Sequence, residues 1–190
     1  MSQLIANRYE SFENLGEGPL FSYTKVRDQQ TEKPLMLLRI VPALQAEAPF
    51  LEGLRSGSTA AEALQHPRIA ASEGFSREDG GFLLFEFCSG IHLKERIRRI
   101  SPFTLAVAVD IALSTAEGLV YAHSMGQVHG SLRSQNIIIS SEGEVKITEF
   151  GIHRGICRSA VAQEAIATEI VPYFAPELRL DSRGTASGDI

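Results

Sequence analysis

The sequence predicts an α+β protein of two lobes, in which a five-stranded antiparallel sheet with one helix precedes a mainly helical lobe. Before residue 89, apolar residues fall in short runs separated by glycine and polar turns, which is typical of strands. After it they recur at helical spacing over longer segments. A chain of 190 residues with 44% hydrophobic content can bury two small cores. We therefore expect a first lobe over residues 1–88 and a second lobe over residues 89–190.

Five segments of the first lobe have the pattern of strands, and they cover residues 7–15, 21–27, 34–41, 68–75 and 81–88. Gly16-Glu17-Gly18-Pro19 makes the turn between the first two. Residues 49–64 have helical spacing, but Ser56-Gly57-Ser58 interrupts it, and Thr59-x-x-Glu62 is the pattern of a capping box. We therefore expect the helix of this lobe to begin only near Ser58.

Two helices open the second lobe: a short amphipathic helix over residues 91–100 and a long helix over residues 102–124 with an apolar stripe. Residues 135–140 and 144–148 flank the turn Ser141-Glu142-Gly143 and predict a β-hairpin. The following stretch to Glu177 shows no regular period, so we expect irregular structure there.

Composition and charge exclude several classes of protein. Lys and Arg number 18 against 23 Asp and Glu, which gives a net charge of −5 and no basic stripe to neutralise phosphates, so we expect no nucleic-acid partner. No apolar run approaches the roughly 18 residues that span a bilayer, and residues 1–10 have no signal pattern. We expect a cytoplasmic chain without a membrane segment, in which Cys88 and Cys157 are reduced thiols.

Seven short motifs follow one another along the chain. They are Leu15-Gly16-Glu17-Gly18, residues 36–42, His66-Pro67-Arg68-Ile69, residues 85–90, residues 121–136, residues 145–151 and Ala175-Pro176-Glu177. In this order they resemble the glycine-rich loop, the V-A-I-K strand, the start of the fourth strand, the hinge, the catalytic loop, and the D-F-G and A-P-E elements of protein kinases. The likeness is greatest to bacterial serine/threonine kinases, and it implies the two-lobe kinase fold.

The resemblance also implies where the catalytic groups would stand, and these positions carry unsuitable residues. A kinase uses a lysine on the phosphates and an aspartate that accepts the substrate proton. Arg39 stands at the lysine position, where its planar guanidinium does not reproduce a compact ammonium. Ser131 stands at the base position, and the missing carboxylate predicts a rate loss of roughly 10²–10⁴-fold. Arg133 stands at the catalytic-loop lysine position. An exposed strand residue without a catalytic role remains an alternative for Arg39.

The helix glutamate that would hold the lysine is also missing in this resemblance. Counting back from His66-Pro67 places Gly57 at its position, although another register offers Glu52 or Glu62. With Gly57 at this position, Arg39 lacks the carboxylate that would orient it on the phosphates.

Gly130 replaces the family's phosphate-sensing arginine. Its absence argues against a switch that depends on phosphorylation of Ser159 or Thr168. His129 is expected to pack against Phe150 and to link the catalytic loop to the D-F-G region, as the resemblance implies, and not to transfer protons.

The nucleotide-binding positions are partly kept. Gly16 and Gly18 remain, although a simple hairpin turn explains them equally well, and Phe21 takes the third glycine position, where a bulky residue hinders approach of backbone amides to phosphate. Tyr23 and Leu37 stand where the family has small residues above adenine. We expect extra side-chain volume in that slot.

The hinge and metal positions complete this degenerate nucleotide site, with Glu86 and Cys88 at the hinge. Asn136 is kept and Glu149 replaces the D-F-G aspartate, which predicts a poor magnesium site because magnesium demands near-ideal octahedral geometry. Structural roles remain open for both residues: Asn136 as a hydrogen-bonding residue of its own loop, and Glu149 as a partner of Arg39 or Arg133.

These expectations favour a catalytically impaired protein kinase-like domain, a pseudokinase, that acts by binding a protein partner or regulating another kinase, with no bound cofactor. The first alternative is an atypical serine/threonine kinase that binds ATP weakly. A second is a small-molecule phosphotransferase, because His129-Gly130-Ser131-Leu132 is similar to the H-G-D-L of that class, but the A-P-E motif favours a protein kinase.

Gly188-Asp189-Ile190 resembles the start of the long central helix of the kinase helical lobe, which continues for several more helices in that family. We therefore expect a partial second lobe. The apolar stripe on residues 102–124 would then lack its partner, which predicts self-association through this exposed face.

Overall fold

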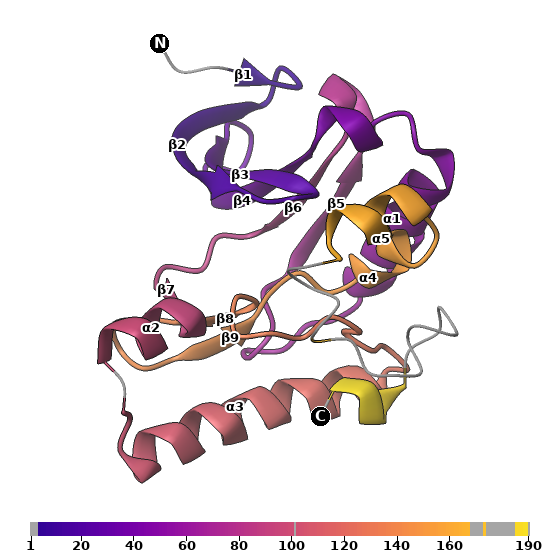
Figure 1. Cartoon of the computed structure of the whole chain (residues 1–190). Coiled ribbons are helices and arrows are strands. Elements are labelled where there is room, and N and C mark those ends of the chain that lie inside the picture. The colour runs from indigo at the N-terminus through magenta and orange to yellow at the C-terminus, as the bar shows by residue number, and fades with distance from the viewer. Residues whose placement is uncertain (1–3, 101, 168–172, 174–184, 190) are drawn as a thin grey trace.

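The computed structural model describes residues 4–100, 102–167, 173 and 185–189. It contains a sheet-rich lobe and a mainly helical lobe, joined by a connecting segment near residues 87–90 (Figure 1). The sheet lies at the top of the view, and the long helix α3 (Leu105–Ser124) runs along the bottom.

The first lobe is an antiparallel sheet of six strands in the order β1-β2-β3-β4-β6-β5. The strands are β1 (Leu4–Ile5), β2 (Tyr9–Glu17), β3 (Phe21–Asp28), β4 (Pro34–Ile40), β5 (Ser72–Ser76) and β6 (Phe82–Glu86), and two 3-10 helices, η1 (Pro42–Leu44) and η2 (Glu78–Gly80), lie between them. The predicted count of five strands was one too low, because a two-residue strand such as β1 is too short to show a period.

Both faces of the sheet are covered, and side chains alternate between them along each strand. On the outer face Ile5 of β1 and Tyr9 pack with Leu37 and Leu84 in one apolar cluster. On the inner face Met36, Leu38, Phe85 and their neighbours pack against helix α1. The N-terminal segment is held to the sheet by Arg8, whose guanidinium donates two hydrogen bonds to the buried Asp28 carboxylate at 2.7 and 2.8 Å.

Helix α1 (Ala48–Ala61) begins ten residues before the predicted start near Ser58. It runs unbroken through Ser56-Gly57-Ser58, because Gly57 lies on its buried side, where the chain after Phe150 approaches closely. Thr59 does not cap a helix; its hydroxyl donates to the Arg55 carbonyl one turn earlier. Of the three candidates for the helix glutamate position, Gly57 faces the second lobe, whereas Glu52 is paired with Arg55 on the exposed side.

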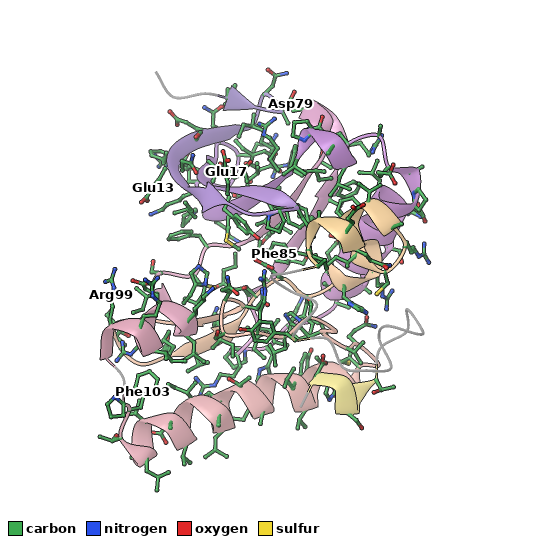
Figure 2. The ribbon with its side chains drawn as sticks, in the orientation of Figure 1. Glu13, Glu17, Asp79, Phe85, Arg99 and Phe103 are labelled. Atoms are coloured by element: carbon green, nitrogen blue, oxygen red, sulfur yellow. The ribbon has the colours of Figure 1, made fainter. Side chains whose placement is uncertain are left out.

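The second lobe begins with a three-stranded sheet under the hinge and the helices α2 (Leu93–Ile100) and α3. Strands β7 (Ile91–His92), β8 (Ile137–Ile139) and β9 (Val145–Ile147) pair in that order, and β8 and β9 form the predicted hairpin. Helix α2 follows β7. Arg99 of α2 and Phe103 ahead of α3 lie at the same end of the lobe (Figure 2).

Helix α3 exposes much of its apolar surface. Leu105 is 81% exposed and Val120 69%, and a groove of about 550 Å³ runs between α3, α2 and the catalytic-loop region. The helix is long and apolar enough to cross a membrane by length and composition, contrary to the expectation that no segment reaches that length. Length and composition are weak support for a membrane span, since core helices of soluble proteins satisfy them too.

The stretch predicted to be irregular contains two short helices, α4 (His153–Ile156) and α5 (Ala160–Ala165), which lie beside α1 in Figure 1. They are shorter than the window needed to detect a helical period. Ser159, a candidate for modification, is buried and caps α5 by accepting a hydrogen bond from the Ala162 N–H at 3.2 Å. Thr168, Ala175-Pro176-Glu177 and Ile190 lie outside the described residues.

Candidate functional site

The catalytic-loop segment, residues 129–136, is anchored by Asp189 of the 3-10 helix η5 (Ala186–Asp189). The two Asp189 carboxylate oxygens accept hydrogen bonds from the backbone N–H groups of His129 at 2.8 Å and Gly130 at 2.7 Å. The ring of His123, on α3, lies 2.9 Å from the same carboxylate. A buried carboxylate with three partners fixes the loop relative to α3.

His129 has the packing role that the resemblance implied. Its ring is fully buried and packs edge-on against Phe150, with 4.8 Å between ring centroids. Its Nε2 donates to the Thr148 carbonyl oxygen at 2.9 Å, so Nδ1 is the acceptor for the Ser131 N–H at 3.3 Å. Burial lowers the pKa of His129 below its ordinary value, which keeps the ring neutral and the loop fixed.

Ser131 and Arg133 lie at the floor of the cleft between the lobes. Ser131 is buried and faces a gap of about 20 Å³, with room on the order of one water molecule. Arg133 stays within its own loop: its guanidinium donates to Asn136 Oδ1 at 3.3 Å and to Gln135 Oε1 at 3.2 Å. Among the described residues that line this gap, Glu149 is the one carboxylate.

Asn136 and Glu149, the two predicted metal positions, are brought together and bind each other. The Asn136 amide donates to Glu149 Oε2 at 2.8 Å, and both side chains are buried. The Tyr23 hydroxyl, from the sheet above, donates a second hydrogen bond to the same carboxyl group. Glu149 has a left-handed backbone with φ of 68°, which is costly for a residue other than glycine and aims its side chain at these partners.

Burial raises the pKa of Glu149 above its ordinary value, and the attraction of Arg133 and the hydrogen bonds from Asn136 and Tyr23 act in the opposite direction. The effect of burial is the largest, so the site favours the protonated, neutral form of this carboxyl group. A group in this state is a poorer ligand for a cation than an exposed aspartate.

The structure does not bring Arg39 to the site. Its side chain points to the outer face of the sheet, and its guanidinium donates to the Asp79 carbonyl at 3.0 Å in an exposed position. Asp79 lies at the top of the first lobe in Figure 2, away from the second lobe. Leu38, the residue of β4 that precedes Arg39, points to the inner face of the sheet and is fully buried.

Leu37 points to the same outer face of the sheet as Arg39, so it does not occupy the predicted slot above adenine. Leu37 belongs to the outer-face cluster, and Met36 faces the cleft in its place. Because side chains of a strand point to opposite faces in turn, aligning the strand one residue differently exchanges every inward residue for an outward one. Tyr23, in contrast, faces the cleft as predicted.

An apolar cluster fills the end of the cleft where a kinase holds phosphates. Phe21, at the third glycine position, packs against Phe50 of α1 with 6.2 Å between ring centroids. Ile152, which precedes α4, and Ile156, the last residue of α4, join the same cluster and line the gap at Ser131. Arg133 and Glu149 line the same gap beside this cluster.

The glycine turn and the hinge border what remains of the cleft. A cavity of about 290 Å³ lies under Gly16 and Gly18 and is lined by Tyr23, Met36 and Arg133, among others. Its lining also includes Gln135 and Glu149.

At the hinge, Glu86 and Cys88 line a separate cavity of about 280 Å³ behind the chain connection. The Glu86 carboxylate forms an ion pair with Lys146 of β9 and accepts a hydrogen bond from the Ala71 N–H at 3.3 Å. Burial raises the pKa of the Cys88 thiol to about 12, so Cys88 is an un-ionised thiol at neutral pH.

Sequence reasoning missed His153, which lies against the catalytic loop. A Cβ atom at Gly130 would meet the His153 ring at 2.5 Å, so Gly130 is the residue that admits the ring. Cys157 Sγ lies 3.1 Å from His153 Nε2 on the far side. In the sequence, Gly130 shows only as the replacement of an arginine. The space that it leaves for the His153 ring is visible only in three dimensions.

A sheet-rich lobe over a helical lobe, with a glycine turn above a loop like residues 129–136, defines the fold of protein kinases. The family model described as the protein kinase domain matches residues 9–190, and the chain therefore belongs to the protein kinase domain family.

The curated relatives of this chain include bacterial serine/threonine kinases. The probable serine/threonine-protein kinase pknA2 of Bifidobacterium longum is 25% identical over 194 residues, which cover 100% of this chain and 26% of that protein. Serine/threonine-protein kinase PknA of Mycobacterium tuberculosis is 26% identical over 192 residues, covering 98% of this chain and 44% of that protein. The chain thus spans less than half the length of these relatives.

A solved structure supports the fold. The Mycobacterium tuberculosis PknI kinase domain superposes with a TM-score of 0.69 at 23% sequence identity, over 80% of this chain and 62% of that chain. Identity at this level shows a common fold.

Proposed function

We propose that this domain is a pseudokinase that acts by binding a protein partner, such as another kinase, and does not transfer phosphate. The observation that carries the proposal is the apolar cluster at the phosphate end of the cleft. Phosphoryl transfer depends on cations and a proton acceptor at that place. Phe21, Ile152 and Ile156 occupy much of that place beside Arg133 and Glu149, and Ser131 offers no carboxylate.

The residues at the metal positions do not fit a magnesium–nucleotide complex as they are arranged. Asn136 Oδ1 accepts from a guanidinium, and its amide nitrogen binds Glu149. Magnesium needs several oxygen ligands at near-octahedral geometry. To supply two of them, Asn136 and Glu149 would have to leave each other and release Tyr23.

A weakly active or ATP-binding serine/threonine kinase is the second candidate, and specific observations favour it. The cavity of about 290 Å³ under the glycine turn is open, and Arg133 at its floor carries positive charge. The kinase relatives also support it. In this reading the Asn136–Glu149 contact is a resting state that nucleotide replaces.

Thermal unfolding with ATP, with and without magnesium, separates the two candidates. A ligand at 100 times its dissociation constant stabilises the folded state by about 2.7 kcal/mol, which for a chain of this size raises the midpoint by roughly 5–10 °C. We expect no shift at millimolar ATP. A clear magnesium-dependent shift would favour the second candidate.

Restoring the base gives an independent test of catalysis. Ser131→Asp returns a carboxylate to the base position, and Ser134→Asp in the same loop is the matched control. We expect neither variant to transfer phosphate from ATP to itself or to a generic protein substrate, because the loss lies at several positions. Transfer by Ser131→Asp alone would show that the rest of the site is competent.

A further inference from the structure

The turn that joins β1 to β2 has an unfavourable backbone conformation. Ala6 and Asn7 both have left-handed backbones, with φ of 49° and 51°, and the Arg8 N–H donates to the Ile5 carbonyl oxygen across the turn at 3.1 Å. Two central residues with positive φ are typical of a type I′ turn, which favours Asn-Gly. Ala6 fits this turn poorly, because its Cβ atom crowds the backbone in the left-handed region. The β1–β2 hairpin is therefore strained at Ala6.

The chain that follows this turn is fixed to the sheet. The Arg8 guanidinium donates two hydrogen bonds to the Asp28 carboxylate, and the Arg8 carbonyl oxygen accepts one from the Gln29 N–H at 3.0 Å. These contacts hold Arg8 at the end of β3. A movement of β1 relative to the sheet would therefore take place at Ala6 and Asn7, which have the position of a hinge.

Strand β1 fills a socket on the outer face of the sheet. Its Ile5 side chain is 3% exposed and packs in the apolar cluster of that face. The Ala6 N–H donates to the Asp79 carboxylate at 2.7 Å. If β1 left this place, the sheet would expose an apolar socket to water, which is unfavourable. A segment that matches the socket in shape and pairing is β1 of a second copy of this chain.

The register of the hairpin allows such an exchange to be symmetric. Leu4 pairs with Glu10 and Ile5 with Tyr9, so the pairs approach Asn7 from both sides. If the turn opens into extended chain, this strand can run antiparallel to the same strand of a second copy with both pairs unchanged. Asn7 then lies opposite Asn7 on a two-fold axis. Because no register shift is needed, every side chain keeps its face of the sheet.

We propose that β1 is an exchangeable strand: two copies of this chain open the turn at Ala6 and Asn7, and each places β1 in the sheet of the other. The exchange joins two sheet-rich lobes at the β1 edge. This surface lies outside the cleft, so the inference goes beyond the proposed function and does not depend on it.

The same contacts of β1 exist in the closed chain and in the exchanged dimer, so two other effects decide between these forms. Relief of the left-handed backbone at Ala6 favours the dimer. The translational and rotational freedom that two chains lose on association favours the closed chain. The closed chain therefore prevails at low concentration, and the exchanged dimer is a minor species that a covalent bond can trap.

Disulfide trapping between two variants tests the exchange. One chain carries Leu4→Cys and the other Glu10→Cys, with different affinity tags, and the mixture is incubated at high concentration with reduced and oxidised glutathione. Residues 4 and 10 face each other across the hairpin, but each chain in this mixture has only one of the two new cysteines. A specific covalent heterodimer requires β1 of one chain to lie beside β2 of the other. We expect this heterodimer to accumulate with time.

A second mixture measures linkage by chance collision. Glu13 and Lys25 are directly paired between β2 and β3, but β3 lies inside the sheet and is not an edge strand that can leave it. Glu13→Cys mixed with Lys25→Cys should give at least fivefold less heterodimer, since association through α3 would bring the chains of both mixtures together equally. The unmodified chain mixed with each variant measures what Cys88 and Cys157 contribute. Equal yields from the two mixtures would overturn the exchange.

Substitutions at the hinge should shift the yield of the first mixture in opposite directions. Ala6→Gly removes the cost of the left-handed backbone and adds freedom that an extended strand loses, so the yield should fall at least threefold. Ala6→Pro excludes a positive φ and removes the N–H that binds Asp79, so the yield should rise at least threefold. An unchanged yield in Ala6→Gly, or no heterodimer with the unmodified hinge, would overturn the proposal.

Glu32→Gly is the matched control for Ala6→Gly. Glu32 also has a left-handed backbone, with φ of 61°, but it lies in the turn between the inner strands β3 and β4. Relief of strain there should leave the yield of heterodimer unchanged. A fall as large as that of Ala6→Gly would mean that general stability, and not the hinge, controls the exchange. If Ala6→Pro does not fold, the comparison of these two glycine variants decides alone.

Discussion

Tyr23 shows at the scale of one residue how the cleft differs from a nucleotide site. It stands where the resemblance places a small residue, and its hydroxyl reaches across the cleft to Glu149. Glu149 in turn holds Asn136. The carboxyl group of Glu149 is thus held by Tyr23 and by the buried Asn136, so these side chains have a structural role.

Removing the Tyr23 hydroxyl should therefore destabilise the fold. Tyr23→Phe leaves a buried carboxyl group with one donor fewer, at a cost of about 1–3 kcal/mol in the free energy of unfolding. Urea unfolding monitored by circular dichroism measures it. Tyr121→Phe is the control, because the Tyr121 hydroxyl accepts from an exposed Gln65 N–H and water can replace it. Equal effects of the two substitutions would show that Tyr23 has no special role.

His153 is the residue through which stability should depend on pH. Burial lowers its pKa from 6.5 to about 4, and the neighbouring His129 adds to the effect. The unfolded chain binds a proton below pH 6.5 and the folded chain does not until about pH 4. Stability is thus complete above pH 6.5 and falls as the pH decreases towards 4, by about 3 kcal/mol over the window. His129 acts in the same direction and Glu149 in the opposite one.

The measurement compares urea unfolding of the unmodified chain and of His153→Phe across this window. The variant keeps a ring against Gly130 but cannot titrate, so its stability should fall less steeply as the pH decreases. Identical slopes would assign the acid sensitivity to other groups.

At the scale of elements, α4 has more influence on the cleft than its four residues suggest. It packs on the buried side of α1, and Ile156 is 1% exposed within the main cluster. Helix α1 also begins earlier than its sequence pattern predicts, since the Gly57 contact compensates for the low helix propensity of Ser-Gly-Ser. Tertiary packing therefore decides both helices.

Truncation of Ile156 tests that packing. Ile156→Ala should lower the free energy of unfolding by about 2–5 kcal/mol, because it removes buried methyl groups and leaves a cavity. Val161→Ala, on the neighbouring helix α5 and 42% exposed, should cost about 0.5 kcal/mol or less. Chemical denaturation compares the two, and a small loss for Ile156→Ala would mean that α4 does not depend on the cluster.

For the whole molecule, the two faces of α3 differ in what covers them. One face packs on β9 and the catalytic-loop region, and the other exposes several large apolar side chains. A contiguous apolar surface of this kind is typical of an interface. Self-association through it remains a prediction for the chain of residues 1–190.

Sedimentation velocity tests this prediction. The unmodified chain should associate as its concentration is raised, and Leu113→Glu should reduce the association by placing a charge on the exposed face. Phe12→Glu on β2 is the control, since Phe12 is 59% exposed and Leu113 58%. Association that persists in Leu113→Glu, or that Phe12→Glu abolishes instead, would move the interface away from α3.

The sequence by itself determined the fold class, the order of the kinase-like motifs, the serine at the base position and the pairing of the β8–β9 hairpin. These follow from the period of apolar residues and from residue types at fixed spacing, both of which can be read along the sequence. It also indicated the His129–Phe150 contact through the family resemblance.

Only the tertiary structure decided which way Arg39 points, where α1 begins, and that Gly57 meets Gly151. A strand buried on both faces has no alternation in its pattern, so its sequence does not reveal which residues face the cleft. Contact between glycines separated by more than 90 residues leaves no local signal, because it depends on the path of both backbones. The chemistry of the cleft is read from the residues, but its closure is a property of their packing.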